Sequence, residues 1–157
     1  MRWPSEGTLT DGWANQRVLL TGASGGIGAA LAEALVQRGA RLLITGRNPT
    51  ALDALVAQFP EHIDAVCADL TLAEDRHRLI GAAHLAGCNM LINAAGSNQT
   101  GFFDTTTDAD IEQLITINLT ATLQLTRALL PQLMAHPQAT IVTLGSTFGQ
   151  LGYPGQV

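Results

Sequence analysis

The stretch RVLLTGASGGIGAALAEALVQRG, residues 17–39, decides the fold. It opens with a short apolar run, 17–21, that is rich in strand-forming residues. It continues into residues 26–39, where apolar side chains recur with the spacing of one helical face. Glycines at positions 22, 26 and 28 lie between the two segments. The stretch therefore predicts a strand, a glycine-rich turn and a helix that ends at Gly39.

The same alternation of strand and helix patterns continues along the chain. The helical segments contain ten residues or more, and connections of that length require parallel strands with right-handed crossovers. We therefore expect a three-layer α/β fold, a doubly wound parallel sheet with helices on both faces, in a domain of residues 17–157 after an N-terminal extension, 1–16. The expected strands are 17–21, 41–45, 63–68, 89–96 and 139–146, and the expected helices are 26–39, 49–59, 72–87 and 108–135.

Composition narrows the class of protein. A chain of 157 residues has room for one domain with a substantial core. The net charge is −5 and the eight basic residues, all arginine, are scattered, which argues against a nucleic-acid-binding surface. Apolar residues never run for the 18 or so positions that a membrane span needs. We therefore expect a soluble, cytoplasmic protein with no membrane partner.

The two cysteines, Cys67 and Cys88, lie in apolar surroundings and have neither metal-ligand nor C-x-x-C spacing. The sequence therefore predicts two buried thiols in a reducing compartment and no metal site.

The glycine turn TGASGGIG, residues 21–28, has a chemical interpretation. Gly22 would permit a tight turn, Gly26 would let the backbone approach a pyrophosphate, and Gly28 would allow close helix–strand packing. The following helix N-terminus offers free N–H groups and partial positive charge to phosphates. On the first strand–helix turn of an alternating chain, this pattern predicts a dinucleotide site, with a purely structural turn as the alternative.

A rival interpretation treats Ser24 as a nucleophile, because GASGG (22–26) also fits the G-x-S-x-G elbow of α/β hydrolases. That fold places several strands before the elbow, whereas only one precedes it here. The histidines also lie in helical or helix-end segments rather than in a strand-end loop. We therefore prefer Ser24 as a hydroxyl on the phosphate loop and keep a serine hydrolase as a remote alternative.

The end of the second predicted strand distinguishes the two nicotinamide cofactors. An NAD site needs a carboxylate there for the ribose hydroxyls, but the sequence reads ITGRN, and the first carboxylate, Asp53, lies within the next helix. Arg47 would instead pair with the 2′-phosphate of NADP, so NADP(H) is favoured over NAD(H). An exposed arginine at a strand end is the structural alternative.

Five motifs in series resemble short-chain dehydrogenases/reductases: TGASGGIG, ADL (68–70), NAAG (93–96), the Asn118 of ITINLTAT and the Ser146 of IVTLGS. The resemblance covers residues 17–157 and implies a Rossmann-type domain that binds NADP(H) and an alcohol or carbonyl substrate. It assigns Gly22, Ser24, Ile27 and Gly28 to the pyrophosphate, Arg47 to the 2′-phosphate, Asp69 and Leu70 to the adenine, and Asn93, Ala94 and Gly96 to the nicotinamide ribose.

The resemblance also implies two catalytic residues. Ser146 would hydrogen-bond the substrate carbonyl, and Asn118 would help to order a water and lysine relay. Asn118 is a poor helix former within an apolar stripe, where a buried amide without a hydrogen bond costs about 1–3 kcal/mol. We therefore expect a buried, functional amide. Taken alone, Ser146 also fits a strand-end serine, Asp69 a helix cap and Asn93 a turn former.

Proton transfer in this family uses a tyrosine whose phenolate is stabilised by a lysine one helical turn later. A free tyrosine, with a pKa near ~10, is a poor base at neutral pH. The family spacing from Ser146 places these residues at positions 159 and 163, whereas the sequence has 157 residues, no lysine and a single tyrosine, Tyr153, in a Gly-Pro loop. Tyr153 is therefore not the predicted catalytic tyrosine.

The resemblance leads us to expect an incomplete copy of an oxidoreductase, with its C-terminal strands missing, that is inactive by itself. Its parent would be a homo-oligomer, and the strand at 139–145 would be an unprotected edge. A non-catalytic dinucleotide-binding or interaction module is the alternative.

Overall fold

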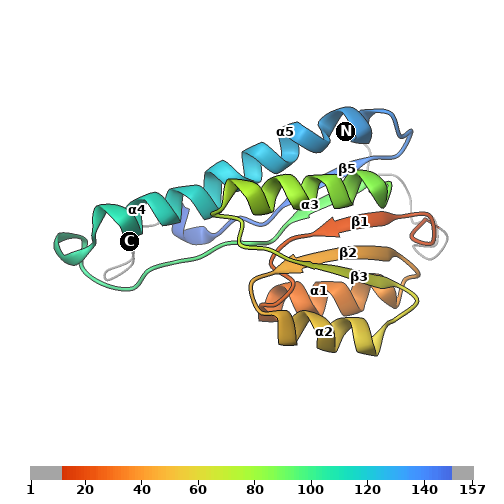
Figure 1. Ribbon diagram of the computed structural model, residues 1–157, viewed down its shortest axis with the longest axis horizontal. Coiled ribbons are helices and arrows are strands. Elements are labelled where there is room, and N and C mark those ends of the chain that lie inside the picture. Colours follow the sequence, from red (N-terminus) through yellow and green to blue (C-terminus); the bar gives the residue numbers. More distant parts are fainter. Residues whose placement is uncertain (1–11, 150–157) are drawn as a thin grey trace.

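A five-stranded parallel sheet forms the centre of the computed structural model, which describes residues 12–149 (Figure 1). The strand order is β3-β2-β1-β4-β5, so the chain builds from β1 to one edge and then crosses to the other side of β1. This topology confirms the predicted doubly wound sheet. The strands are β1 (Arg17–Leu20), β2 (Arg41–Gly46), β3 (Ile63–Cys67), β4 (Met90–Asn93) and β5 (Thr140–Thr143).

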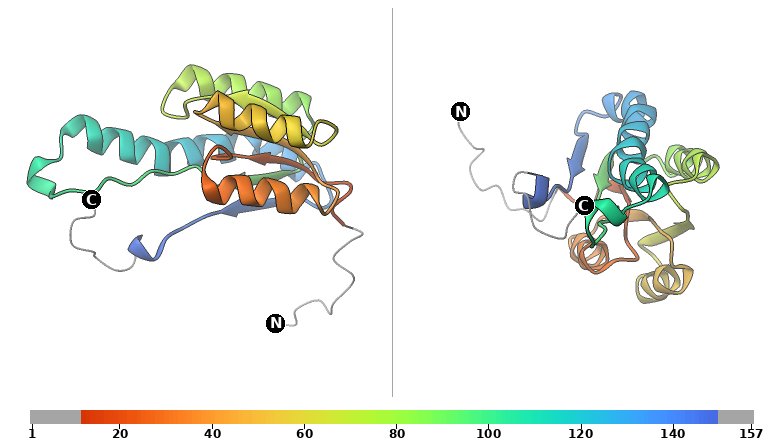
Figure 2. Two further views of the ribbon diagram at one scale, coloured as in Figure 1. Left: turned by 90° about the horizontal axis from the view of Figure 1, so that it is seen from below. Right: turned by 90° about the vertical axis from the view of Figure 1, so that its left-hand side faces the viewer.

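Helices cover both faces of the sheet, α1 and α2 on one and α3 and α5 on the other, while α4 extends beyond the sheet (Figures 1 and 2). Local sequence fixes several starts: Asn48 caps α2 and Pro49 occupies its first turn, while Thr107 and Asp110 form a capping box at α4. The helices are α1 (Gly26–Val36), α2 (Pro49–Gln58), α3 (Ala73–Leu85), α4 (Asp108–Ile115) and α5 (Ala121–Met134), with 3-10 turns η1 (Phe103–Thr105) and η3 (Thr147–Gly149).

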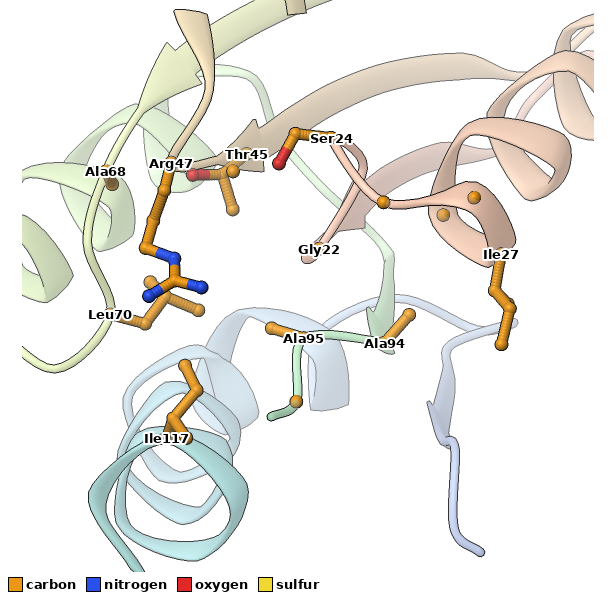
Figure 3. Close-up of a pocket in the computed structure, with 15 residues that line it drawn as sticks. Gly22, Ser24, Ile27, Thr45, Arg47, Ala68, Leu70, Ala94, Ala95 and Ile117 are labelled. Carbon is orange, nitrogen blue, oxygen red and sulfur yellow. The ribbon is translucent and has the colours of Figure 1, made fainter. Parts of the chain in front are cut away.

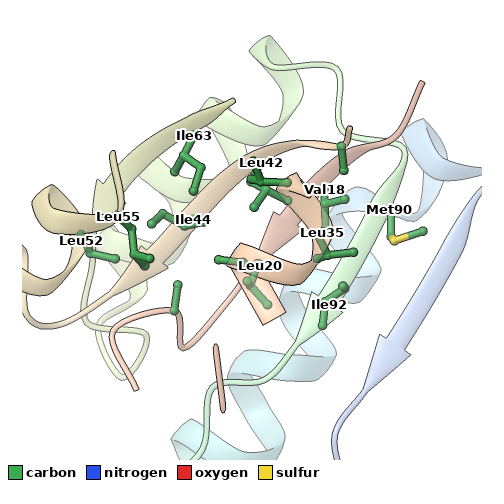
Figure 4. Packing of buried hydrophobic residues seen from close by; sticks show 14 residues of the cluster. Val18, Leu20, Leu35, Leu42, Ile44, Leu52, Leu55, Ile63, Met90 and Ile92 are labelled. Atoms are coloured by element: carbon green, nitrogen blue, oxygen red, sulfur yellow. The ribbon is translucent and has the colours of Figure 1, made fainter. Parts of the chain in front are cut away.

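Alternation along β1 divides the hydrophobic core into two layers. Val18 and Leu20 belong to the cluster beneath α1 and α2, where Leu35 and Ile44 are also buried (Figure 4). Leu19 points to the opposite face and packs in the cluster under α3 and α5. Because burying a leucine side chain contributes about 1.5–3 kcal/mol, both faces hold the central strand in place. The packed central strand therefore fixes the positions of the loops at the strand ends.

The helix predicted over 108–135 is continuous from Asp108 to Met134, but it is not uniform. A π-helical segment, η2 (Thr116–Thr120), separates α4 from α5 and contains Asn118. π segments in helices are frequent at functional sites. This one lies where the long helix passes the carboxyl ends of the strands (Figure 1).

The predicted edge at 139–145 is confirmed. Within residues 12–149, β5 pairs only with β4, and all four of its residues are exposed. Ile141 and Val142 are 40% and 39% exposed, so the apolar side chains of this strand remain partly uncovered within the described residues. Figure 2 shows β5 at one side of the sheet.

The two cysteines differ, although both were predicted to be buried. Cys88 is 2% exposed, as predicted. The prediction for Cys67 was wrong, because this thiol is exposed. Cys67 is the last residue of β3, the edge strand that pairs only with β2, so its apolar sequence neighbours do not cover it.

Between residues 12 and 149, no helix has both the length and the apolar character to cross a membrane. The same residues contain no group of three or more His, Cys, Asp or Glu side chains placed to hold a metal ion.

Candidate cofactor and active site

Two glycines of the turn after β1 are required by its packing. Gly22 has φ +72°, a backbone conformation that L side chains rarely adopt, and a Cβ there would lie 2.7 Å from the carbonyl oxygen of Ala94. A Cβ on Gly28 would overlap the Gly22 carbonyl oxygen. The turn can therefore fold tightly against α1 and against the loop after β4 only with glycine at both positions.

Gly26 differs from these two, because a Cβ there would meet no atom within 4 Å. It is the first residue of α1, and no side chain caps this helix, whose N-cap is Gly25. Uncapped N–H groups and the helix dipole make such an N-terminus a binding site for anions. The open space next to Gly26 is large enough for a group of the ligand, and a methyl group on Gly26 would narrow it. We call this space the phosphate cradle.

A pocket of about 390 Å³ opens beside this turn (Figure 3). Its walls come from the loops that follow β1, β2, β3 and β4, together with one residue of η2. The position matches the general rule for open α/β sheets, which bind ligands beyond the carboxyl ends of the strands where the strand order reverses. The lining residues are Gly22, Ser24, Gly25, Gly26, Ile27, Gly28, Thr45, Gly46, Arg47, Ala68, Leu70, Ala94, Ala95, Gly96 and Ile117.

Arg47 extends into this pocket beside Leu70 (Figure 3). It directly follows Gly46, where a Cβ would overlap the Ser24 hydroxyl, so the end of β2 lies close against the glycine turn. The ion pair present among residues 12–149 joins Asp75 to Arg78, and Arg47 forms none. The guanidinium is therefore a positive charge available to a ligand near the phosphate cradle.

The Ser24 side chain points toward Thr45 (Figure 3). The pocket lining contains neither a histidine nor a carboxylate that could activate this hydroxyl as a nucleophile. The geometry therefore favours the phosphate-loop interpretation of Ser24 over the hydrolase alternative.

Asp69 and Leu70 form a loop at the edge of the pocket, and only Leu70 lines it. The Asp69 carboxylate accepts hydrogen bonds from the backbone N–H (2.9 Å) and the hydroxyl (2.7 Å) of Thr71. Burial favours the neutral acid, but these two bonds and the charge of Arg47 outweigh it, so the pKa of Asp69 lies below its usual value. Asp69 thus stays ionised and stiffens the loop that carries Leu70.

Asn93 is 3% exposed and lies behind the pocket rather than in its wall. Its Nδ2 donates weak hydrogen bonds of 3.4 Å to the hydroxyls of Thr126 and Thr143, and its Oδ1 is buried without a partner among the described residues. These contacts join the end of β4 to α5 and β5. Of the NAAG motif, Ala94, Ala95 and Gly96 face the pocket.

Thr21 is a site residue that sequence reasoning missed. It is 1% exposed, and its hydroxyl oxygen accepts hydrogen bonds of 3.0 Å from the backbone N–H groups of both Ala94 and Ala95. The side chain therefore fixes the loop after β4 against the end of β1. A threonine directly before the glycine turn was the available signal, but its partners are more than 70 residues away. Thr45 and Ile117 also line the pocket and were not predicted.

The burial predicted for Asn118 was wrong. Its side chain is exposed, and it forms a pair of hydrogen bonds with the backbone of Ser97, donating to the carbonyl oxygen (2.8 Å) and accepting from the N–H (2.9 Å). A Cβ on Gly96 would come within 3.1 Å of the Asn118 Oδ1. The amide is therefore satisfied, as expected, and it holds the loop after β4 against the long helix.

Ser146 follows β5, is exposed, and does not line the pocket. Its carbonyl oxygen accepts a 3.1 Å hydrogen bond from Gly149 and so closes the turn η3. Tyr153 lies outside the described residues.

The fold defines an α/β protein of the Rossmann type. The sequence profile of the short chain dehydrogenase family matches residues 16–157. This chain therefore belongs to the short-chain dehydrogenase/reductase family, a family of oxidoreductases, and the resemblance stated above is confirmed.

Several curated proteins are similar in sequence. Nodulation protein G of Rhizobium sp. (strain N33) is 35% identical over 144 residues, which cover 90% of this chain and 58% of that protein. The 3-oxoacyl-(acyl-carrier-protein) reductase FabG of Rickettsia bellii is 32% identical over 141 residues, again covering 90% of this chain and 58% of the relative. The chain thus spans less than two thirds of the length of these relatives.

Solved structures agree with the family assignment. A short-chain dehydrogenase from Streptomyces avermitilis is 35% identical, with a TM-score of 0.83, over 89% of this chain and 52% of that one. A metagenomic short-chain oxidoreductase in complex with NADP is 30% identical, with a TM-score of 0.81, over 88% of this chain and 65% of that one.

Proposed function

We propose that this chain forms the NADP(H)-binding part of an oxidoreductase that transfers hydride between nicotinamide and an alcohol or carbonyl substrate. The observation that carries the proposal is the guanidinium of Arg47, which directly follows β2 and has no ion pair among the described residues. It lines the same pocket as the uncapped N-terminus of α1. No carboxylate lines the pocket to accept hydrogen bonds from ribose hydroxyls, as an NAD site would require. The NADP complex of a 30% identical neighbour supports the same preference.

The residues of the pocket fit such a cofactor. The cradle at Gly26 would take the pyrophosphate, Arg47 the 2′-phosphate, and the wall of Ala94 to Gly96 the nicotinamide ribose. The bound nicotinamide would supply or accept the hydride. Thr21 and Asn118 would keep the wall in position, since both hold the loop after β4 by hydrogen bonds to its backbone.

The substrate would meet the chain at Ser146. Ser146 follows β5, the strand that pairs with β4, and would donate a hydrogen bond to the substrate oxygen. An alcohol or carbonyl substrate is supported by the relatives, which include a 3-oxoacyl-(acyl-carrier-protein) reductase and an alcohol dehydrogenase from Comamonas testosteroni specific for bulky-bulky ketones.

Fluorescence titration of the purified chain with NADPH and with NADH tests the cofactor. We expect NADPH to bind roughly 10–100-fold more tightly than NADH, because one charge-assisted hydrogen bond changes an affinity by about that factor. Equal affinities would reject the NADP preference, and no binding of either cofactor would reject the proposed function. With a panel of small ketones we expect no loss of NADPH absorbance from this chain, because it contains no lysine to stabilise a tyrosine phenolate; turnover would contradict that expectation.

A further inference from the structure

A second hollow lies between α3 and α5, and none of its lining residues belongs to the cofactor pocket. Its volume is about 570 Å³, within the range of small-molecule sites. Three of its side chains are basic, Arg76 and His77 on α3 and Arg127 on α5, and none is acidic. The other lining residues are Ala73, Ile80, Gln124 and Ala128. We call this hollow the α3–α5 groove.

Arg76 is the unusual member of the groove, because its side chain is only 7% exposed. Its Nε donates to the Gln124 Oε1 (2.8 Å) and its Nη1 to the carbonyl oxygen of Leu70 (2.6 Å), so both acceptors are neutral. The ion pair found among residues 12–149, between Asp75 and Arg78, does not involve it. This guanidinium is largely shielded from water and has no anionic partner among the described residues, and the groove is where an anion could approach it.

The two fixed hydrogen bonds also hold the guanidinium in one orientation. They occupy Nε and Nη1, and Nη2 donates to no residue of the part described here. A rigid guanidinium with a free amino group is suited to bind a planar or tetrahedral oxyanion, because little side-chain entropy is lost on binding. Arg76 is therefore pre-organised as the base of an anion site.

The side chains around Arg76 add charge to the same place. Arg127 projects from the facing helix, is exposed and forms no ion pair within residues 12–149, while His77 is exposed on α3. The first residue of α3, Ala73, also lines the groove, and no side chain caps this helix end. The same first turn carries Glu74 and Asp75, but neither lines the groove, and Asp75 is paired with Arg78.

We infer that the α3–α5 groove binds the phosphate group of a small molecule, at a site separate from the cofactor pocket. Two arginines on facing helices match the double charge of a phosphate monoester better than the single charge of a carboxylate. The apolar part of the groove, Ile80 and the alanines, would contact the carbon atoms that carry the phosphate.

A titration with inorganic phosphate, followed by NMR at constant ionic strength, tests this site on the full chain. The reporters are the Nε–H signal of Arg76 and the methyl signals of Ile80, whereas the amide of Gly26 reports phosphate bound in the cofactor pocket. We expect saturable shifts at Arg76 and Ile80. In the double variant Arg127→Gln/His77→Gln, the half-saturation concentration of phosphate should rise about tenfold or more. Loss of one charge-assisted hydrogen bond weakens binding by roughly that factor.

The matched control is Arg41→Gln, which removes an exposed arginine at the start of β2. It should titrate like the unaltered chain. The inference fails if the Arg76 and Ile80 signals shift linearly without saturating, or if they saturate equally in the double variant. The Gly26 amide keeps this result apart from the proposed cofactor function, because phosphate can bind at either place without the other.

Discussion

The Nη1 of Arg76 donates a 2.6 Å hydrogen bond to the carbonyl oxygen of Leu70, so a buried cation of α3 holds one wall of the cofactor pocket from behind. The neighbouring Asp75 acts in the same way, accepting a 2.7 Å hydrogen bond from the Asp69 N–H. Gln124 of α5 fixes Arg76 in turn. The conformation of the loop after β3 therefore depends on the packing of two helices and not on the loop sequence alone.

Arg76→Met should weaken binding of the adenine half of the cofactor and leave binding of the nicotinamide half unchanged. The change removes both donors and leaves the Leu70 carbonyl without its partner, which costs about 1–3 kcal/mol of unfolding free energy. Calorimetry should show an affinity for 2′,5′-ADP that falls about tenfold, whereas nicotinamide mononucleotide binds as before. Arg41→Met, the same change at an exposed site, serves as the control. Equal losses for both half-ligands would mean that Arg76 acts only on global stability.

Arg47→Ala should discriminate between the two cofactors. The variant loses the charge proposed to meet the 2′-phosphate, so NADPH should bind roughly 10–100-fold more weakly while NADH changes little. Raising the salt concentration should reduce the difference in the unaltered chain, because a partly exposed ion pair is screened. Fluorescence titrations of both cofactors measure the effect. A loss of the same size for NADH would remove Arg47 from the assigned role.

Alanine substitutions at two glycines of the turn should have different effects, one on NADPH binding and the other on the stability of the fold. Gly26→Ala adds a methyl group that meets no protein atom, so the fold should be retained or stabilised by about 0.5–1 kcal/mol, as for alanine replacing glycine in a helix. The same methyl group enters the phosphate cradle, and NADPH binding should be lost.

Gly28→Ala is the matched comparison, because its Cβ would overlap the Gly22 carbonyl oxygen. Overpacking of this kind costs about 1–3 kcal/mol, so urea unfolding should shift for Gly28→Ala and not for Gly26→Ala. Unchanged NADPH affinity in Gly26→Ala would place the pyrophosphate elsewhere.

The fold and part of the site follow from local sequence, because strands, helices and the glycine turn are determined by near neighbours. Arg47 was predicted in the same way, from its place after a strand. Asn118 was also predicted, but its burial was wrong, because its amide bonds the backbone of Ser97, 21 residues away in the sequence. Thr21 and Arg76 act on partners distant in sequence or hidden behind the pocket, and no local pattern reveals such contacts.

The two thiols should differ in reactivity, because one is buried and the other is exposed. Cys88 is 2% exposed, and burial raises its pKa to about 11 despite the opposing charge of Arg17. At pH 8 roughly one thousandth of such a thiol is the reactive thiolate, and reagent access is blocked as well. Cys67 is exposed at the end of β3, and its Sγ lies 3.8 Å from the carbonyl oxygen of Arg47.

Iodoacetamide at pH 8 should therefore modify one thiol of the native chain and both after denaturation. Mass spectrometry of the digested protein should locate the native modification at Cys67, and Cys67→Ser should abolish it. NADP(H) should slow the reaction if it occupies the site proposed at Arg47, because the cofactor would cover the adjacent end of β3. Modification of Cys88 at the rate of Cys67 would contradict the burial of Cys88. An unchanged rate at Cys67 with saturating NADP(H) would contradict the position proposed for the 2′-phosphate.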